Sequence, residues 1–178
     1  MTDFVHLHLH TEYSLLDGAA KVEDLCDYMV ANGIDTCAVT DHGNMYATLY
    51  FAEECVKRKL KYIIGCELYV TDDYTVKTPS SKTEHIVLLA KNKTGYKNIV
   101  WLDSTAYIDG FYGKPRVDYK TLKEHSEGVI CLSACLAGRL PRLLMAGDYE
   151  GAKAFAADMK KTFGEDFYIE LQYLNLPE

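Results

Sequence analysis

Short apolar runs alternate along the chain with segments in which apolar residues recur every three or four positions. The runs have the length of buried strands and cover residues 4–10, 36–40, 61–70, 85–90, 128–133 and 167–171. The periodic segments predict helices over 21–32, 44–59, 95–105, 118–124, 140–145 and 148–163. Gly33 and Gly164 are the expected helix stops, and Asn44, Thr94 and Asp148 are the expected N-caps.

This repeated strand–helix order predicts an α/β protein with a parallel sheet, either open or closed into a barrel. The chain has 178 residues, which is enough for one domain, 1–178, with a sizeable core. Both architectures place their ligands at the carboxyl ends of the strands. The polar residues that follow the strands are therefore the first candidates for a functional site.

Composition and charge narrow the class of protein. The formal net charge is −7 and no long basic stripe is present, so we expect another domain or subunit to supply most of any nucleic-acid affinity. No apolar run of about 18 residues predicts a membrane span, and the N-terminus lacks the pattern of a signal peptide, so we expect a cytoplasmic protein. The six cysteines form no CxxC pair, which favours reduced thiols over disulfides.

Three histidines alternate along the first predicted strand. His6, His8 and His10 point to one face because side chains alternate across a strand. Each buried imidazole needs partners for two ring nitrogens, and neutral imidazole is a common ligand for zinc, iron and other transition metals. The alternating set favours a metal site over three unrelated histidines.

The next two strands add an Asp-His pair and a carboxylate. Asp41 and His42 directly follow an apolar strand, where we assign His42 as a ligand and Asp41 as a catalytic-site residue that orients a histidine or a bound water. Glu67 lies inside an apolar run, where a buried carboxylate needs a partner. A metal would be such a partner, and a carboxylate can also bridge two metals. The alternatives are that Asp41 and His42 only shape a turn, and that Glu67 forms a salt bridge.

The later strands contribute two weaker candidates. His85 comes early in its strand, which suits a ligand less well, and a conventional buried histidine is an equal alternative. Cys135 follows the fifth strand. It is either a thiolate that binds zinc or a buried thiol. Together the candidates exceed the four ligands of a closed structural zinc site. They indicate two or three metals with open positions, an arrangement typical of phosphate-ester hydrolysis.

Several of these motifs resemble the PHP (polymerase and histidinol phosphatase) superfamily. The first are His8-Leu9-His10-Thr11, Ser14, Thr40-Asp41-His42-Gly43 and Gly65-Cys66-Glu67. The runs 8–18, 40–45, 114–118 and 132–138 are similar to one branch, the N-terminal PHP domains of bacterial replicative DNA polymerase III alpha subunits. The resemblance covers nearly the whole chain.

The resemblance implies a distorted (β/α)7 barrel that holds up to three divalent metals, often zinc, manganese or iron. The implied ligands are His8, His10, Asp17, His42, Glu67, His85 and Cys135. Only the resemblance selects Asp17 as a ligand, since its spacing indicates no more than a turn. The resemblance also makes Arg116 a candidate phosphate contact, with a salt bridge as the alternative. His6 becomes a supporting or structural residue.

The end of the chain departs from the family pattern. The family's last strand carries an Asp and a His as final ligands, and no such motif precedes Leu176-Pro177-Glu178. We therefore expect a chain cut before the barrel closes.

The resemblance implies a metal-dependent phosphoesterase, a 3′–5′ exonuclease that proofreads a DNA 3′ end within a larger polymerase beside other replicase subunits. One alternative is a non-catalytic module, stabilised by metal, that docks a partner. A free-standing histidinol-phosphate-type phosphatase is a further alternative, against which the runs 114–118 and 132–138 argue.

Overall fold

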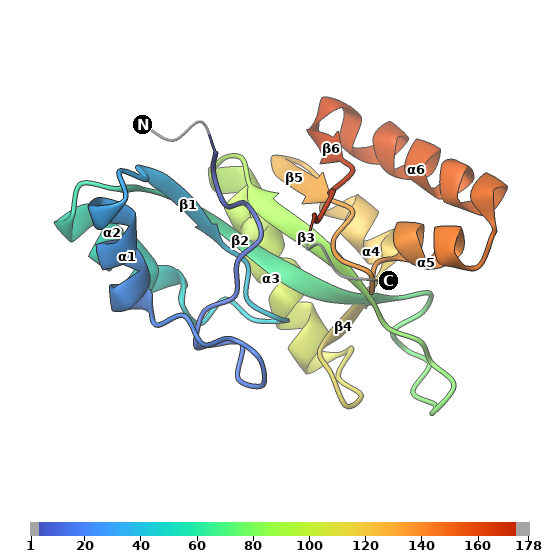
Figure 1. Ribbon diagram of the computed structural model, residues 1–178. Coiled ribbons are helices and arrows are strands. Elements are labelled where there is room, and N and C mark those ends of the chain that lie inside the picture. Colours follow the sequence, from blue (N-terminus) through green and yellow to red (C-terminus); the bar gives the residue numbers. More distant parts are fainter. Residues whose placement is uncertain (1–3, 174–178) are drawn as a thin grey trace.

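The computed structural model describes residues 4–173, which fold into helices around a mixed sheet (Figure 1). The helices in this range are α1 (Val22–Ala31), α2 (Thr48–Lys57), α3 (Lys93–Ile108), α4 (Tyr119–Glu124), α5 (Arg139–Met145) and α6 (Tyr149–Phe163), followed by the 3-10 turn Gly164–Asp166. The strands are β1 (Thr36–Val39), β2 (Lys61–Thr71), β3 (Glu84–Ala90), β4 (Arg116–Asp118), β5 (Val129–Leu132) and β6 (Phe167–Tyr168). None of these helices combines the length and the apolar character needed to cross a membrane. The predicted end at 176–178 lies outside the described residues.

The sheet has the order β1-β2-β3-β5-β6, and β4 pairs with the far end of β2. The prediction of an all-parallel sheet is wrong at β3, which runs antiparallel to both β2 and β5. The reason is the connection over residues 72–83, which contains no helix, whereas a parallel return needs a crossover. β1 with β2, β2 with β4 and β5 with β6 are parallel.

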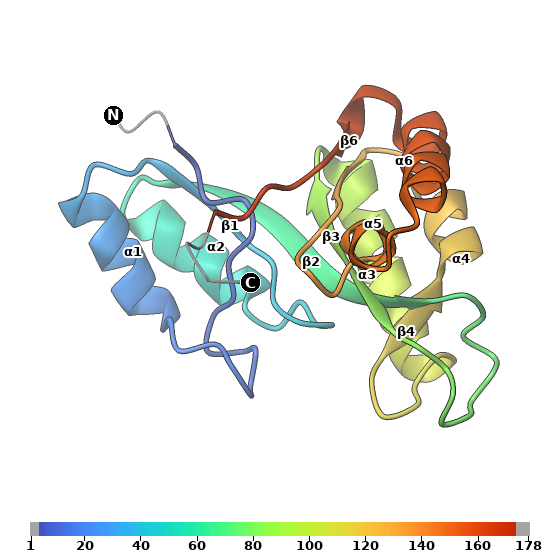
Figure 2. The same cartoon turned by 45° about the vertical axis from the view of Figure 1, so that its right-hand side comes forward.

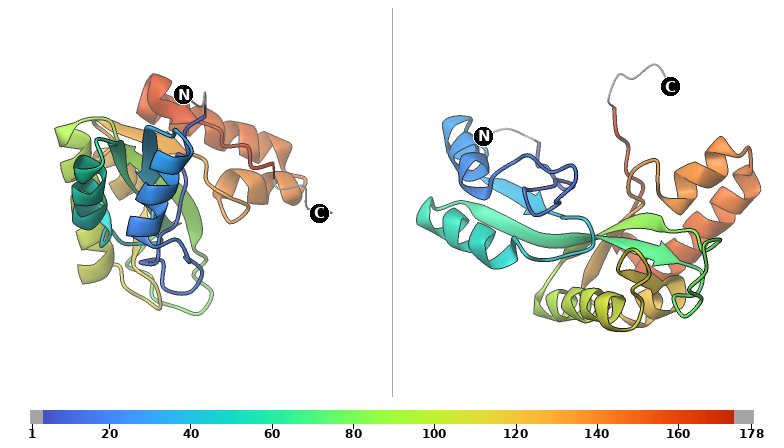
Figure 3. Two further views of the ribbon diagram at one scale, coloured as in Figure 1. Left: turned by 60° about the vertical axis from the view of Figure 1, so that its left-hand side comes forward. Right: turned by 90° about the horizontal axis from the view of Figure 1, so that it is seen from below.

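The predicted barrel is not closed in the described residues. β1 and β6 lie at opposite ends of the strand order, and no pairing joins them within residues 4–173. Figure 3 shows the long β2 crossing the molecule, with α1 and α2 at one end and α5 and α6 at the other. The architecture is therefore an open, mixed α/β sheet.

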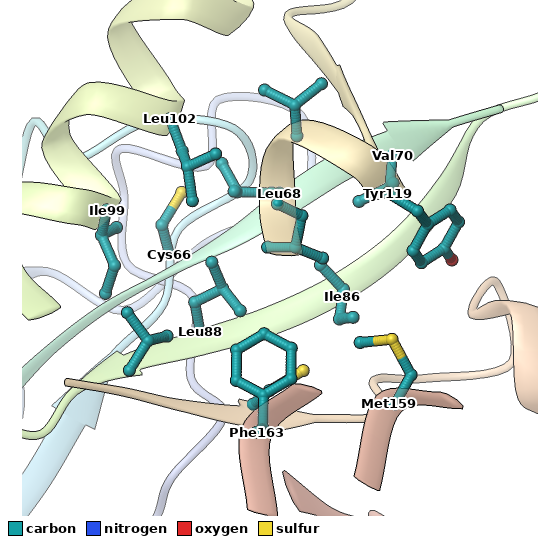
Figure 4. Close-up of a cluster of buried hydrophobic side chains, with 14 of the residues drawn as sticks. Cys66, Leu68, Val70, Ile86, Leu88, Ile99, Leu102, Tyr119, Met159 and Phe163 are labelled. Carbon is teal, nitrogen blue, oxygen red and sulfur yellow. The ribbon is translucent and has the colours of Figure 1, made fainter. Parts of the chain in front are cut away.

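The alternation of β2 separates the main core from the opposite face of the sheet. Cys66, Leu68 and Val70 are fully buried with Ile86 and Leu88 of β3 (Figure 4). Apolar residues of α3, α4 and α6 cover this face, and burial of each large side chain contributes about 1.5–3 kcal/mol. The other side chains of β2, including Glu67, point to the opposite face.

A second core holds α1 and α2 against β1. It contains Val22, Cys26 and Met29 of α1 with Phe51 and Cys55 of α2. All six cysteines are free, and all but Cys135 are buried.

Several predicted boundaries change in the structure. Residues 4–10 form no strand, although the backbone carbonyls of His6 and Leu9 accept hydrogen bonds at 2.8 Å from Ala38 and Thr40. Asn44 does not cap α2, which begins at Thr48. Its side chain instead donates to the carbonyls of Tyr13 and His42 and accepts the N–H of Tyr46. The cap of α3 is Asn92 rather than Thr94. Asp148 caps α6 as predicted, and the last strand is shorter than 167–171.

Candidate metal centre

Glu67 lies at the middle of the candidate centre, and its side chain is 1% exposed. The backbone beyond β1 continues to pair with β2 here. The Glu67 N–H donates to the carbonyl of Asp41 at 3.1 Å, and the Gly43 N–H donates to the carbonyl of Glu67 at 2.8 Å. This pairing places His42 directly beside Glu67.

Four imidazoles surround the Glu67 carboxylate. His8 Nε2 lies 2.6 Å from Oε2, His10 Nε2 lies 3.0 Å from it, and His42 Nδ1 lies 3.6 Å from it. His85 Nδ1 contacts the other oxygen, Oε1. The rings of His10 and His42 stack with centroids 4.0 Å apart. Residues from three separate segments of the chain therefore converge on one buried carboxylate.

The direction of β3 explains why His85 reaches the cluster from an early position in its strand. Because β3 runs antiparallel to β2, its first residues lie beside the end of β2, and His85 pairs with Tyr69. The same reversal brings the end of β5 to this place. Cys135 Sγ lies 3.6 Å from His85 Nδ1 and 3.8 Å from Glu67 Oε1.

Asp41 organises the loop that carries His10 and Asp17. Its carboxylate is buried and accepts hydrogen bonds from Thr11 N at 2.7 Å, Thr11 Oγ1 at 2.8 Å and Ser14 Oγ at 2.8 Å. Ser14 Oγ lies 3.3 Å from His10 Nδ1 and also accepts the N–H of His42 at 3.1 Å. Asp41 is thus linked to the ring of His10 through Ser14, and its role in orienting a histidine stays a prediction.

Asp17 stands at the outer side of the cluster. Its Oδ2 lies 2.9 Å from Nε2 of His42, and its side chain is 58% exposed. Gly18 allows the tight return of this loop, because a Cβ there would lie 1.8 Å from the carbonyl oxygen of Thr11. Periodicity and spacing alone gave no reason to select Asp17.

Glu170 is a site residue that the sequence analysis missed. Its Oε1 lies 2.7 Å from His8 Nδ1, and its N–H donates to Ser133 Oγ at 2.9 Å. The available signal was an acidic residue inside the last predicted apolar run, the same signal that selected Glu67. The ion pair between His8 and Glu170 is largely shielded, with side chains 10% and 14% exposed.

The hydrogen bonds in the cluster decide its protonation. Burial lowers the pKa of His8, but hydrogen bonds to Glu170 and Glu67 outweigh burial and raise that pKa to about 10. Burial likewise opposes the rise of the His85 pKa to about 9, which hydrogen bonds to Cys135 and Glu67 produce. Burial would raise the pKa of Glu67, yet hydrogen bonds from His10, His8 and His85 hold it far below its usual range.

The donor set fits divalent metals. Two groups of ligand atoms, each within 4.8 Å of one another, are His8 with His10 and Glu67, and His42 with Glu67 and His85. Both groups share Glu67, as a carboxylate between two metals would require. His42 Nδ1 and Glu170 Oε2 are buried without a hydrogen-bond partner among the described residues. Such orphaned atoms are expected where an ion supplies the missing interaction.

Two residues lie outside this cluster. Arg116 is 1% exposed and donates to the backbone carbonyls of Gly110, Tyr74 and Val76. Backbone carbonyls, rather than a carboxylate, therefore take its hydrogen bonds, and its contact with a substrate phosphate stays a prediction. His6 is exposed and meets the ring of Phe4 edge-on, with centroids 4.9 Å apart.

Comparison with known proteins defines the class. The PHP domain family model matches residues 6–173, so the chain belongs to the PHP domain family. The DNA polymerase III subunit alpha of Treponema pallidum is 47% identical over 180 residues, which cover 98% of this chain and 15% of that protein. The same subunit of Borreliella burgdorferi is 45% identical over 173 residues, covering 95% of this chain and 15% of that protein. The chain therefore spans about 15% of the length of these relatives.

The solved structures that match this chain are less similar to it in sequence. An amidohydrolase from Chromobacterium violaceum matches with a TM-score of 0.42 and 22% identity. The match covers 57% of this chain and 32% of that chain.

Proposed function

We propose that this PHP domain is part of a bacterial DNA polymerase III alpha subunit and hydrolyses phosphodiesters at a DNA 3′ end. Near-complete coverage of the chain by such subunits supports the first part. The observation that carries the chemistry is the position of Glu67, which both candidate ligand groups share. Glu67 could therefore contribute to two metal sites, and two-metal sites support in-line displacement at a phosphoryl group by stabilising the attacking and leaving oxygens.

The cluster is proposed to hold two or three divalent metals, with zinc, manganese and iron as the candidates. Imidazole and thiolate suit zinc and iron, and carboxylates also suit manganese. The proposed ligands are His8, His10, Asp17, His42, Glu67, His85 and Cys135. When bound, such metals lower the pKa of a coordinated water and neutralise phosphoryl oxygens.

The chain's own residues would hold this chemistry in place. Asp17 fixes the ring of His42 through Nε2. Ser14 bonds both the backbone of His42 and the ring of His10, and Asp41 anchors Ser14. The two proposed catalytic-site residues would thus have different tasks: His42 would hold a metal, and Asp41 would position the loop.

The test is removal of a mismatched 3′ nucleotide from a primer–template by the full-length subunit. Cleavage should require added metal, stop with chelator and fall at least about 100-fold in Glu67→Gln, because the variant disrupts both ligand groups. Glu54→Gln is a matched control, since Glu54 is also buried but lies on α2 beside Lys57 and Arg58. Cleavage that is equal with and without chelator, and equal in Glu67→Gln and Glu54→Gln, would contradict the proposed nuclease activity.

A second function is a metal-stabilised module that docks other replicase subunits in the cytoplasm. The supporting observation is that the cluster ties the N-terminal segment, through His8, to Glu67 of β2 and to Glu170 beyond β6. Metal would then raise the melting temperature of the subunit, while chelator would leave its nuclease rate unchanged. A metal-dependent nuclease rate would reject a purely structural module.

A further inference from the structure

We infer that Lys114 binds a backbone phosphate of the nucleic-acid strand whose 3′ end enters the metal centre. This inference rests on the proposed function and identifies a substrate contact for it. Lys114 is exposed, and its Nζ lies 4.2 Å from the centroid of the Tyr69 ring. Tyr69 in turn packs against two of the proposed ligands, His42 and His85, with centroids 6.1 Å and 5.0 Å away. One aromatic ring therefore separates the ammonium group from the cluster.

The loop that presents Lys114 is anchored at its base. Arg116 is buried and bonds the backbone carbonyls of Gly110, Tyr74 and Val76. Gly113 turns the loop with a φ of 69°, and an isolated bridge pairs Tyr112 with Lys114 across this turn. This framework holds the backbone from which the Lys114 side chain extends.

The loop also packs closely on the wall of the metal centre. A Cβ at Gly43 would lie 2.9 Å from Pro115 Cγ and 2.9 Å from the Tyr69 ring. Gly43 immediately follows His42, so the position of Lys114 is coupled to the segment that carries a proposed ligand. The run 114–118 contributes no residue to the metal cluster, but it packs beside it.

The charge of Lys114 is available to a ligand. Within residues 4–173 no carboxylate forms an ion pair with its ammonium group, and the Tyr69 ring holds it through a cation–π contact. The surrounding site carries the carboxylates Asp17, Glu67 and Glu170, and the whole chain has a net charge of −7. A polyanionic strand that approaches this acidic chain needs a fixed cation next to the metals, and Lys114 supplies one.

The test is the salt dependence of binding to a short single-stranded oligothymidylate with phosphorothioate linkages, which keep the charge and resist cleavage. Fluorescence anisotropy would give Kd as a function of NaCl concentration for the chain and its variants. Loss of one single-strand phosphate contact lowers the slope of log Kd against log salt by about 0.7. We expect this decrease in Lys114→Gln and recovery of the slope in Lys114→Arg.

Lys97→Gln is the matched control, because Lys97 is an exposed lysine on α3, which covers the opposite face of the sheet. An unchanged slope in Lys114→Gln, an equal decrease in Lys97→Gln or no binding by the unsubstituted chain would overturn the inference. The outcome is separate from that of the nuclease assay. Cleavage with an unchanged slope rejects Lys114 alone, whereas a lowered slope without cleavage rejects the nuclease alone.

Discussion

The Nδ1 atom of His8 lies 2.7 Å from Oε1 of Glu170, although the two residues stand 162 positions apart in the sequence. His8 belongs to the segment that lies beside β1, and Glu170 follows β6, so the contact joins the two ends of the strand order. Figure 2 shows the segment after β6 crossing toward the N-terminal segment. A side-chain contact therefore links the edges of a sheet that no strand pairing closes within the described residues.

Replacement of Glu170 by Gln should weaken this link. The variant keeps a hydrogen-bond acceptor for His8 but loses the charge, so the metal-free domain should lose about 1–3 kcal/mol of unfolding free energy near pH 6. Urea denaturation with chelator present measures the change. Glu165→Gln is the control, since Glu165 is 95% exposed and pairs with Lys160. Equal midpoints for the two variants would show that the His8–Glu170 contact does not stabilise the fold.

The stability of the metal-free domain should fall as the pH rises from about 6.5 toward 10. The folded-state pKa of His8 is about 10 and that of His85 is about 9, both above the ordinary value of 6.5. Their contribution is complete below about pH 6.5 and is lost as each folded-state pKa is passed. The depressed pKa of Glu67 acts in the opposite range, with stability lost below about pH 4.5. A urea midpoint at pH 9 equal to or above that at pH 6, with chelator present, would contradict this protonation pattern.

Asp41→Ala should destabilise the loop that holds His10 and Asp17. The substitution leaves Thr11 and Ser14 without a buried, charged acceptor, which should cost about 3 kcal/mol or more. It should also weaken metal binding, because Ser14 would no longer be fixed beside His10. Denaturation and metal titration measure the two effects, with the exposed Asp109 replaced by Ala as the control. Wild-type behaviour in both would mean that Asp41 does not organise the loop.

Local patterns in the sequence predicted most elements but not their spatial arrangement. The apolar runs at β1, β2, β3 and β5 and the cap at Asp148 have local causes, and each is present. The direction of β3 depends on the connection over 72–83, and the assumption that every connection was a crossover produced the wrong all-parallel sheet. The same assumption made His85 look misplaced, although its early position in an antiparallel strand brings it to Glu67.

The candidate site was only partly visible in the sequence. His8, His10, His42 and Glu67 stood out because polar ligand types interrupt apolar patterns. Asp17 came from family resemblance alone, because a loop position gives no periodic signal. Glu170 and the role of Arg116 depend on contacts between distant segments, at His8 and at residues 74–76. That all seven candidates bind metal stays a prediction, as does the absence of a final strand and its ligands.

Elemental mass spectrometry of the purified chain, beside Glu67→Gln and Glu54→Gln, tests whether the cluster around Glu67 binds metal. We expect two or three divalent metals per unsubstituted chain and per Glu54→Gln chain. We expect a sharp loss in Glu67→Gln, because that glutamate belongs to both ligand groups. A folded, unsubstituted chain that binds no metal after incubation with zinc, manganese or iron, or a Glu67→Gln chain that keeps its full metal content, would contradict metal binding by this cluster.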